Sequence, residues 1–397
     1  MGFSAYRQTG LTHNDGEGTY DGYTLITPQG GSKTLLLNME GRIVHAWEFT
    51  DILPGYGRLL DNGNLLLRGV ERDLWDEDTL CWIEGEEGDE KPSDDKFNLD
   101  IRVREMGANA SLIREVDWDG NVVWEYKNKR IHHDFVKTAN GHAVLVEWVE
   151  LPAEVEAQVA GGLPKSPNNT LPMLGDEIFE LDAEGNELWR VKLWELHDPI
   201  KDPICPLEPR TEWTHLNSLD VNERGDVLFS CRNNSRVGII DGETKKLVWN
   251  YGQPNIFHQH HATFLPNGNV QIFDNGMHRH GVPRSRVIEV DTKTDEIVWE
   301  YLATPEIQFF SAHISGADRL PNGNVLICEG APGRIFEITL EGRVVWEWVN
   351  PIVQHVRGGP SHAIFRAHRY DESHKAISGR GFGDNKAVDE LNAVYGL

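Results

Sequence analysis

The chain has 397 residues, of which 39% are hydrophobic and 25% charged, and its formal net charge is −25. This length and apolar content suffice for a globular protein with a sizeable core. The negative charge argues against nucleic acid or an anionic membrane as a partner. No apolar run reaches transmembrane length, and the polar first seven residues predict no signal peptide. Four cysteines without paired spacing predict free thiols, and hence a cytoplasmic protein.

In chain order, the first predicted strands are short apolar runs over residues 22–27, 34–38 and 43–47. They lack a preceding inner strand. At the other end, residues 361–370 are predicted to form an inner strand with no partners after it. If the two ends complete one four-stranded sheet, no open sheet edge remains.

Between these ends, two signatures alternate along the chain. The first is a tight turn between apolar runs, usually Asn-Gly, which favours a hairpin because glycine tolerates the positive φ of such turns. The second is a short apolar run that ends in tryptophan. The turns lie at residues 61–64, 139–142, 223–226, 266–269 and 321–324, and the tryptophans are Trp47, Trp124, Trp189, Trp249, Trp299 and Trp346.

Six such units, each with four short strands, predict an all-β fold, a six-bladed β-propeller closed by one blade shared between the termini. We expect residues 1–397 to form a single propeller domain, with blades from about residue 20 to 370 and one tryptophan per outer strand in the core. The tail over residues 371–397 is polar and glycine-rich, so we expect an irregular segment.

Three insertions interrupt the repeat, at about residues 70–108, 150–175 and 193–213. The first two follow the second strand of a blade and the third follows an outer strand, so all three belong on the face opposite the Asn-Gly turns. They could cover a central pocket, because loops on a rigid scaffold often carry function. They could equally be solvated or form a subunit contact, which leaves open a homo-oligomer.

Histidines recur at fixed positions before the turns. His215, His258 and His313 lie nine residues before the first turn residue, and His133 and His260 lie seven before it. Positions two apart on a strand face the same side, so these residues should point from several blades toward the axis. His362 matches His313 when the last two inner strands are aligned.

Arginines are expected near the same face, among them Arg232 and Arg284 in loops after second strands. Arginine forms bidentate, charge-assisted bonds with anions. Histidines and arginines together therefore predict a pocket for a small anionic molecule, such as a sulfate or a carboxylate.

The stretch from Phe257 to Asn269, followed by Ile272–Gly276, Ser285–Asp291 and Val298–Tyr301, resembles the bacterial arylsulfotransferase (aryl-sulfate sulfotransferase) family. The resemblance runs from about residue 20 to 370 and is strongest from 215 to 350. It implies a six-bladed propeller that moves a sulfuryl group from an aryl sulfate to a phenol through a channel histidine, without a nucleotide donor or other cofactor. By position it implies His313 as the nucleophile, then His260 and His133 as catalytic residues, and Arg284 as a substrate-binding residue. The other residues expected in the channel, namely His215, His258, His362 and Arg232, are then expected to bind the substrate.

Two other interpretations stay open. Neutral imidazole is a common ligand for zinc and transition metals, so His215, His258, His260, His313 and His362 could hold a metal for a lyase, hydrolase or oxidase acting on a small molecule. Alternatively, the propeller could be a non-catalytic scaffold, although a scaffold does not require histidines on its axis.

Overall fold

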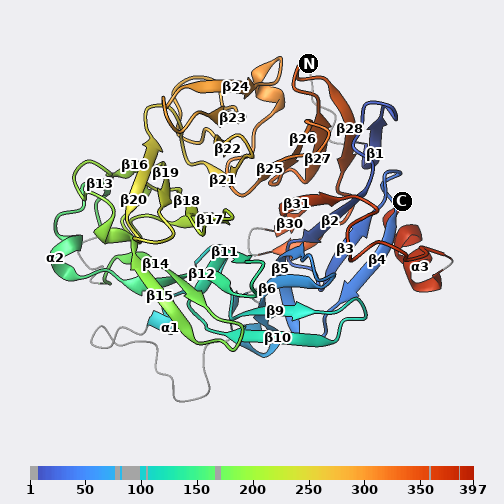
Figure 1. Ribbon diagram of the computed structural model, residues 1–397, viewed down its shortest axis with the longest axis horizontal. Helices are drawn as coiled ribbons and strands as arrows, with labels where there is room; N and C mark the ends of the chain where they lie inside the picture. The colour runs from blue at the N-terminus through green and yellow to red at the C-terminus, as the bar shows by residue number, and fades with distance from the viewer. Residues whose placement is uncertain are drawn as a thin grey trace.

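The computed structural model describes residues 8–76, 81–82, 99–103, 106–165, 171–356, 359–383 and 385–397. Six four-stranded antiparallel blades surround a central axis (Figure 1), which confirms the predicted six-bladed propeller. One strand of each blade lies closest to the axis. These inner strands are β5 (Ile52–Leu59), β11 (Ile131–Lys137), β17 (Leu216–Val221), β21 (His260–Phe264), β25 (Gly316–Arg319) and β31 (Ile364–Tyr370).

The remaining strands follow each inner strand outward in chain order, except in the blade that the two termini share. The order in each sheet agrees with the repeats in the sequence. These strands are β6 (Leu65–Glu71), β9 (Leu112–Val116) and β10 (Val122–Lys127); β12 (Ala143–Glu150), β14 (Leu174–Leu181) and β15 (Glu187–Lys192); β18 (Val227–Cys231), β19 (Arg236–Ile240) and β20 (Leu247–Gly252); β22 (Val270–Asp274), β23 (Arg286–Val290) and β24 (Ile297–Tyr301); β26 (Val325–Glu329), β27 (Arg334–Ile338) and β28 (Val344–Val349); and β2 (Tyr23–Pro28), β3 (Lys33–Leu37) and β4 (Ile43–Glu48).

The shared blade closes the ring as predicted. C-terminal β31 pairs antiparallel with N-terminal β2, with Leu25 opposite His368. One strand was not predicted: β1 (Gly10–Asn14) pairs with the outer edge of β28 and adds a fifth strand to the blade of β25 to β28. Its short polar sequence carries no strand pattern, so the pairing depends on the open edge of β28.

The expectation of an irregular tail was wrong for its last residues, which form helix α3 (Lys386–Tyr395). The Asn385 side chain caps its first turn, and Gly396 ends it with a φ of 70°. Asn392 is buried and bonds both backbone groups of Ile43, accepting from its N–H (2.8 Å) and donating to its C=O (2.9 Å). The helix therefore fixes the outer edge of the closing blade.

This contact gives a prediction for stability. Asn392→Ala leaves the N–H and C=O of Ile43 buried without partners, which should lower the free energy of unfolding by about 1–3 kcal/mol. Chemical denaturation will measure the change. Val394→Ala on the same helix is the control, since Val394 is 76% exposed and should change stability by less than about 0.5 kcal/mol. Equal losses in both variants would contradict the assigned role of Asn392.

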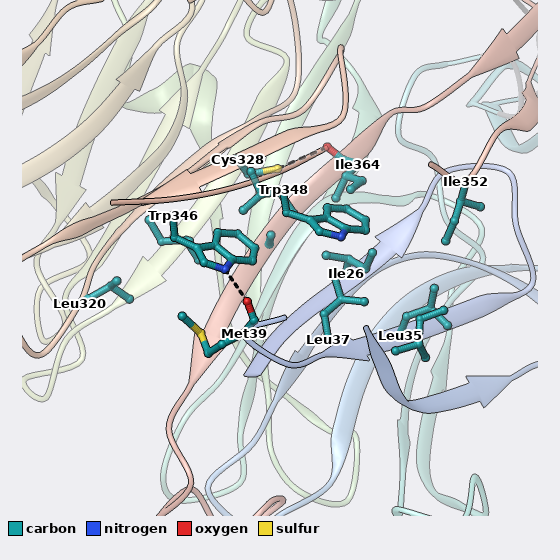
Figure 2. Close-up of a cluster of buried hydrophobic side chains, with 14 of the residues drawn as sticks. Ile26, Leu35, Leu37, Met39, Leu320, Cys328, Trp346, Trp348, Ile352 and Ile364 are labelled. Carbon is teal, nitrogen blue, oxygen red and sulfur yellow. Dashed lines mark hydrogen bonds between the residues drawn. The ribbon is translucent and has the colours of Figure 1, made fainter. Parts of the chain in front are cut away.

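Neighbouring blades are joined by the outer-strand tryptophans, as the repeat predicted. Figure 2 shows Trp346 and Trp348 of the last full blade packed against Ile26, Leu37 and Met39 of the closing blade. The Trp346 indole N–H donates to the Met39 carbonyl at 2.9 Å. The indole N–H of Trp47 donates likewise to the Asp117 carbonyl, and that of Trp299 to the Leu340 carbonyl, each in the turn between the third and fourth strands of the next blade. Trp249 reaches the corresponding turn by donating to the Asp295 carboxylate.

The described parts of the three insertions pack together on one face. Helix α1 (Leu99–Arg102) of the first insertion packs on Trp148, and its Arg102 donates to the Thr211 carbonyl at 3.0 Å. In the second and third insertions, β13 (Gly161–Leu163) and β16 (Ile204–Pro209) pair in parallel. Most of the first insertion lies outside the described residues.

The remaining described elements are short. None of the described helices is long and apolar enough to span a membrane. These elements are η1 (Arg72–Leu74), β7 (Trp75–Asp76), β8 (Cys81–Trp82), α2 (Ala153–Glu156), η3 (Leu193–Glu195), η4 (Glu306–Gln308), β29 (Gln354–Val356) and β30 (Gly359–Ser361).

Candidate active site

The middle of the propeller axis is filled by charged side chains. Arg366 of β31 and Asp134 of β11 are both fully buried and form an ion pair at 2.7 Å. Arg58 of β5 lies 3.7 Å from the same carboxylate. Burial opposes ionisation of Asp134, but the two guanidinium groups outweigh it and lower the pKa of Asp134. Three blades are thereby tied together across the axis.

His313 lies on the turn that precedes inner strand β25. It is exposed to solvent, and neither of its ring nitrogens bonds to a described residue. Enough protein still surrounds the ring that burial lowers the pKa of His313, and the positive charge of Arg232 lowers it further. His313 is therefore an accessible, neutral imidazole at neutral pH.

The turn that carries His313 is fixed by a buried network. His260 accepts from the N–H of Ile314 through Nε2 (3.2 Å), and its Nδ1 lies 2.8 Å from the Asn275 side-chain oxygen. The Asn275 amide in turn donates to the carbonyls of Ser311 (2.9 Å) and Ile314 (3.0 Å). Both ring nitrogens of His260 are thus occupied, which suits a residue that positions His313 better than one that attacks a substrate.

A chain of three side chains ends at His133. Asp176 Oδ1 lies 3.2 Å from His132 Nε2, and His132 Nδ1 lies 2.7 Å from His133 Nδ1. With a proton on His132 Nε2 facing the carboxylate, His133 donates through Nδ1 and its Nε2 keeps a lone pair. The His133 ring meets that of His215 edge-on, with centroids 4.5 Å apart. Burial and the neighbouring histidines lower the pKa of His133 well below its ordinary value.

His215 and Arg232 complete this group, and both contact acidic residues of the third insertion. His215 Nδ1 lies 2.6 Å from Glu212 Oε1, so Nε2 is left for a substrate or another ligand. Arg232 donates to Glu208 Oε1 at 2.8 Å. The charge of Arg232 contributes to the lowered pKa of His258, His260 and His313. The structure therefore brings His133, His215, His260, His313 and Arg232 into one electrostatic neighbourhood.

His258 belongs to a second group next to the first. Its ring is fully buried and meets the His278 ring edge-on, with centroids 4.7 Å apart. Cys205 of β16 places its Sγ 3.4 Å from His278 Nδ1. One ligand atom from each of Cys205, His258 and His278 lies within 4.8 Å of the other two. Burial and then Arg232 lower the pKa of His258 to about 2.

Two predicted site residues lie apart from these groups. Arg284 is 28% exposed and pairs with Glu306 at 3.1 Å. His362 is exposed, and its Nδ1 lies 3.0 Å from the Asn350 carbonyl oxygen. Among the contacts of the described residues, none joins either side chain to the other histidines. The five histidines predicted as possible metal ligands are not gathered at one point either. Of the five, only His258 lies in a group of three close ligand atoms in the described part of the chain, and its partners there are Cys205 and His278.

The local backbone explains why strand parity could not place every histidine. The register shifts within β11 next to His133, in β17 after Leu216, and in β21 at His261. His133, His215, His258 and His278 adopt left-handed φ values of 50°, 52°, 53° and 62°. Such conformations cost roughly 1–3 kcal/mol for non-glycine residues and concentrate at functional sites. Bulges and left-handed residues re-aim side chains, so alternation along a strand no longer applies.

Sequence reasoning placed the third insertion on this face but identified none of its side chains as part of the site. Cys205, Glu208 and Glu212 all come from residues 193–213 and contact the channel histidines or Arg232. Asp176 and His278 were missed as well. The position of the insertion was a usable signal for side chains near the site, because the insertion immediately precedes an inner strand on the histidine-bearing face.

Comparison with known proteins supports the family assignment. The family model for arylsulfotransferase (ASST) matches residues 113–351, more than half of the chain. No curated protein matches. A crystal structure of a protein of unknown function from Bacteroides caccae shares the fold at 13% identity with a TM-score of 0.52, and the match covers 88% of this chain and 99% of that one.

Two lyase structures are also similar, but at TM-scores below 0.5 they support no inference about function. Virginiamycin B lyase from Staphylococcus aureus is 14% identical with a TM-score of 0.42, covering 76% of this chain and 71% of that one. A streptogramin B lyase is 14% identical with a TM-score of 0.46, covering 91% and 93%. From the family match and the six-bladed fold, we conclude that this chain belongs to the arylsulfotransferase (ASST) family.

Proposed function

We propose that this protein transfers a sulfuryl group from an aryl sulfate to a phenolic acceptor without a nucleotide donor, with His313 as the nucleophile. Membership of the arylsulfotransferase family supports a transferase. The observation that carries the proposal is the His313 ring, which is accessible, neutral and free of hydrogen bonds to described residues on a turn fixed by its neighbours. A neutral imidazole has the lone pair that nucleophilic attack on sulfur requires.

The reaction proceeds in two balanced steps. A ring nitrogen of His313 attacks the sulfur, an N–S bond forms, and the S–O bond to the donor breaks to release a phenolate. The oxygen of the acceptor phenol then attacks the same sulfur, the N–S bond breaks, and the phenolic proton passes to a neighbouring neutral imidazole. His133 is suited to take that proton, because Asp176 and His132 leave its Nε2 with a lone pair.

The other residues of the group bind and orient. Arg232 and His215 are the proposed partners of the sulfuryl oxygens, because a cation and an N–H donor stabilise charge that develops in the transition state. His260 positions the His313 turn through Ile314. Arg284, His258 and His362 have no part in this proposal, since their contacts lie elsewhere.

The test is an assay of the purified, untagged protein with para-nitrophenyl sulfate and phenol. The proposal expects release of para-nitrophenolate that depends on the phenol, with phenyl sulfate formed in equal amount and no nucleotide added. Release of para-nitrophenolate with inorganic sulfate as the sole sulfur product would show hydrolysis instead. If no aryl sulfate in a panel of donors reacts, with phenol, catechol and naphthol as acceptors, the proposal is wrong.

The proposed role of His313 predicts a pH profile. Its pKa lies below the ordinary 6.5, so the neutral, nucleophilic form persists as the pH falls through that value. We expect kcat/KM to stay level down through pH 6.5 and to fall only at lower pH. Arg232→Gln removes a positive charge that lowers this pKa, so the acidic limb should move to higher pH. An acidic limb centred at or above 6.5 in the unaltered protein would contradict the neutral assignment.

A metal-dependent reaction is the second candidate. It is favoured by the carboxylate Glu212 behind His215, since metal-binding histidines usually pass their second N–H to a carboxylate or carbonyl oxygen. A chelator that abolishes activity while the protein stays folded, with activity restored by added metal, would favour this candidate over sulfuryl transfer by His313 alone.

A further inference from the structure

A compact set of metal-type ligands lies beside the proposed active site. Cys205 comes from β16 of the third insertion, His258 from the segment before β21, and His278 from the turn after β22. Their ligand atoms lie within 4.8 Å of one another, and this is the one such set among the described residues. Glu208 adds a carboxylate, with Oε1 3.4 Å from His258 Nδ1 and 3.8 Å from His278 Nδ1.

We propose that Cys205, His258 and His278 form a zinc-type metal site, whose fourth position is open to water or to the adjacent Glu208 carboxylate. One sulfur, two imidazole nitrogens and one carboxylate oxygen suit Zn²⁺, which binds all three ligand types in a tetrahedral shell. Zinc bond lengths place neighbouring ligand atoms roughly 3.3–3.6 Å apart. The separation of 3.4 Å between Cys205 Sγ and His278 Nδ1 fits that spacing, as does the His258–Glu208 separation. The His278–Glu208 separation of 3.8 Å is wider, so Glu208 would have to move to bind the ion together with His278.

The His258 ring gives independent support. It is fully buried, yet neither Nδ1 nor Nε2 makes a hydrogen bond. A buried polar group without a partner costs about 1–3 kcal/mol, and each such group needs a physical explanation. A metal ion bound to one of the His258 ring nitrogens would give that nitrogen the partner it lacks. The left-handed backbones of His258 and His278 add strain of the kind found at ligand sites.

The segments that carry the ligands are held by their own hydrogen bonds. The Cys205 N–H donates to the Asn233 carbonyl at 2.8 Å, and the His258 N–H donates to Ser235 Oγ at 3.1 Å. The Gly276 N–H donates to the Phe257 carbonyl at 2.9 Å, which joins the last two segments. The ligands are therefore brought together before any ion binds. A bound ion would fasten the third insertion to two turns of the propeller.

One nearby charge opposes a cation. Arg232 donates to the same Glu208 oxygen at 2.8 Å, so its guanidinium lies close to the ion. The Glu208 carboxylate and a Cys205 thiolate carry two negative charges that offset Arg232 and one charge of the ion. The site should therefore bind a divalent ion and release a proton from the thiol, as metal binding to cysteine does.

The test uses the full-length, untagged protein after removal of metal by a chelator. Titration with Co²⁺ should give a near-ultraviolet thiolate-to-cobalt absorption band that saturates at one ion per chain, and Zn²⁺ should displace it. Zn²⁺ should also raise the melting temperature, because an ion that binds the folded state stabilises it. Cys205→Ser should lose the thiolate band, and His278→Gln should weaken Zn²⁺ binding at least about 100-fold.

The matched control is His280→Gln, two residues from His278 on the same turn, where the side chain is exposed. It should bind both metals like the unaltered protein. Circular dichroism will establish that each variant is folded. If Cys205→Ser or His278→Gln does not fold, the other ligand variant is compared with His280→Gln. Absence of the thiolate band in the unaltered protein, or equal Zn²⁺ affinity in His278→Gln and His280→Gln, would overturn the proposal. The result is independent of sulfuryl transfer, since the readouts are absorption and melting temperature.

Discussion

His313→Ala will lower kcat/KM for sulfuryl transfer by at least about 1,000-fold, because loss of a nucleophile removes the covalent route altogether. The fold should survive, since the ring is exposed and bonds to no described residue. Steady-state assays with para-nitrophenyl sulfate and phenol, together with a denaturation curve for each variant, will measure both effects.

His260→Ala is the informative comparison for that variant. Loss of the His260 ring removes the bonding partner of the Ile314 N–H and of the Asn275 side-chain oxygen, which together hold the His313 turn. We expect a smaller loss of activity than in His313→Ala, accompanied by a loss of stability. His280→Ala should change neither quantity. A His313→Ala variant that keeps activity within tenfold of the unaltered protein would show that another residue attacks the sulfur.

Asp134→Asn will lower the free energy of unfolding by about 3–5 kcal/mol, because it leaves Arg366 as a buried charge without its counterion. Both side chains of the pair are completely buried, and the pair connects β11 with β31 across the axis. Arg58 would lose the same partner. Urea denaturation at neutral pH will measure the loss.

The double variant Asp134→Asn with Arg366→Met separates the pair from the packing around it. Replacing both members removes the uncompensated charge, so part of the lost stability should return. Glu48→Gln is the exposed control, because its pair with Lys33 lies at the surface and should contribute less than about 1 kcal/mol. If Asp134→Asn costs less than Glu48→Gln, the ion pair does not hold the inner strands together.

The propeller was predictable from sequence because each repeat contains strong local sequence signals. A tight glycine turn and an outer-strand tryptophan recur in every full blade, the turn being Asn-Gly in all but the β17–β20 blade, and each tryptophan lies where the repeat placed it. Helix α3 and strand β1 were missed for opposite reasons. The helix has a short, weakly apolar face, and its contact with β4 combines the Asn392 hydrogen bonds with packing of Val388. Strand β1 acquires its conformation from the free edge of β28.

The candidate site was predictable in outline and not in detail. The recurrence of histidines predicted rings from several blades near the axis, and the contacts of the described residues join His133 to His215 and His260 to the turn that carries His313. Sequence spacing could not assign their partners, because bulges and left-handed residues turn individual rings out of strand alternation. It also could not place Cys205 or Glu208, which reach His258 and Arg232 only through the tertiary packing of the third insertion.

The central claim is that His313 carries the sulfuryl group, and trapping that intermediate tests it most directly. The protein would be mixed with an aryl sulfate in the absence of any phenol acceptor, quenched rapidly, and analysed by intact and peptide mass spectrometry. The account predicts a mass increase of one sulfuryl group, located on the peptide that contains His313 and lost when phenol is added. Phenol-dependent turnover with no such modified peptide, or with the group on another histidine, would contradict it.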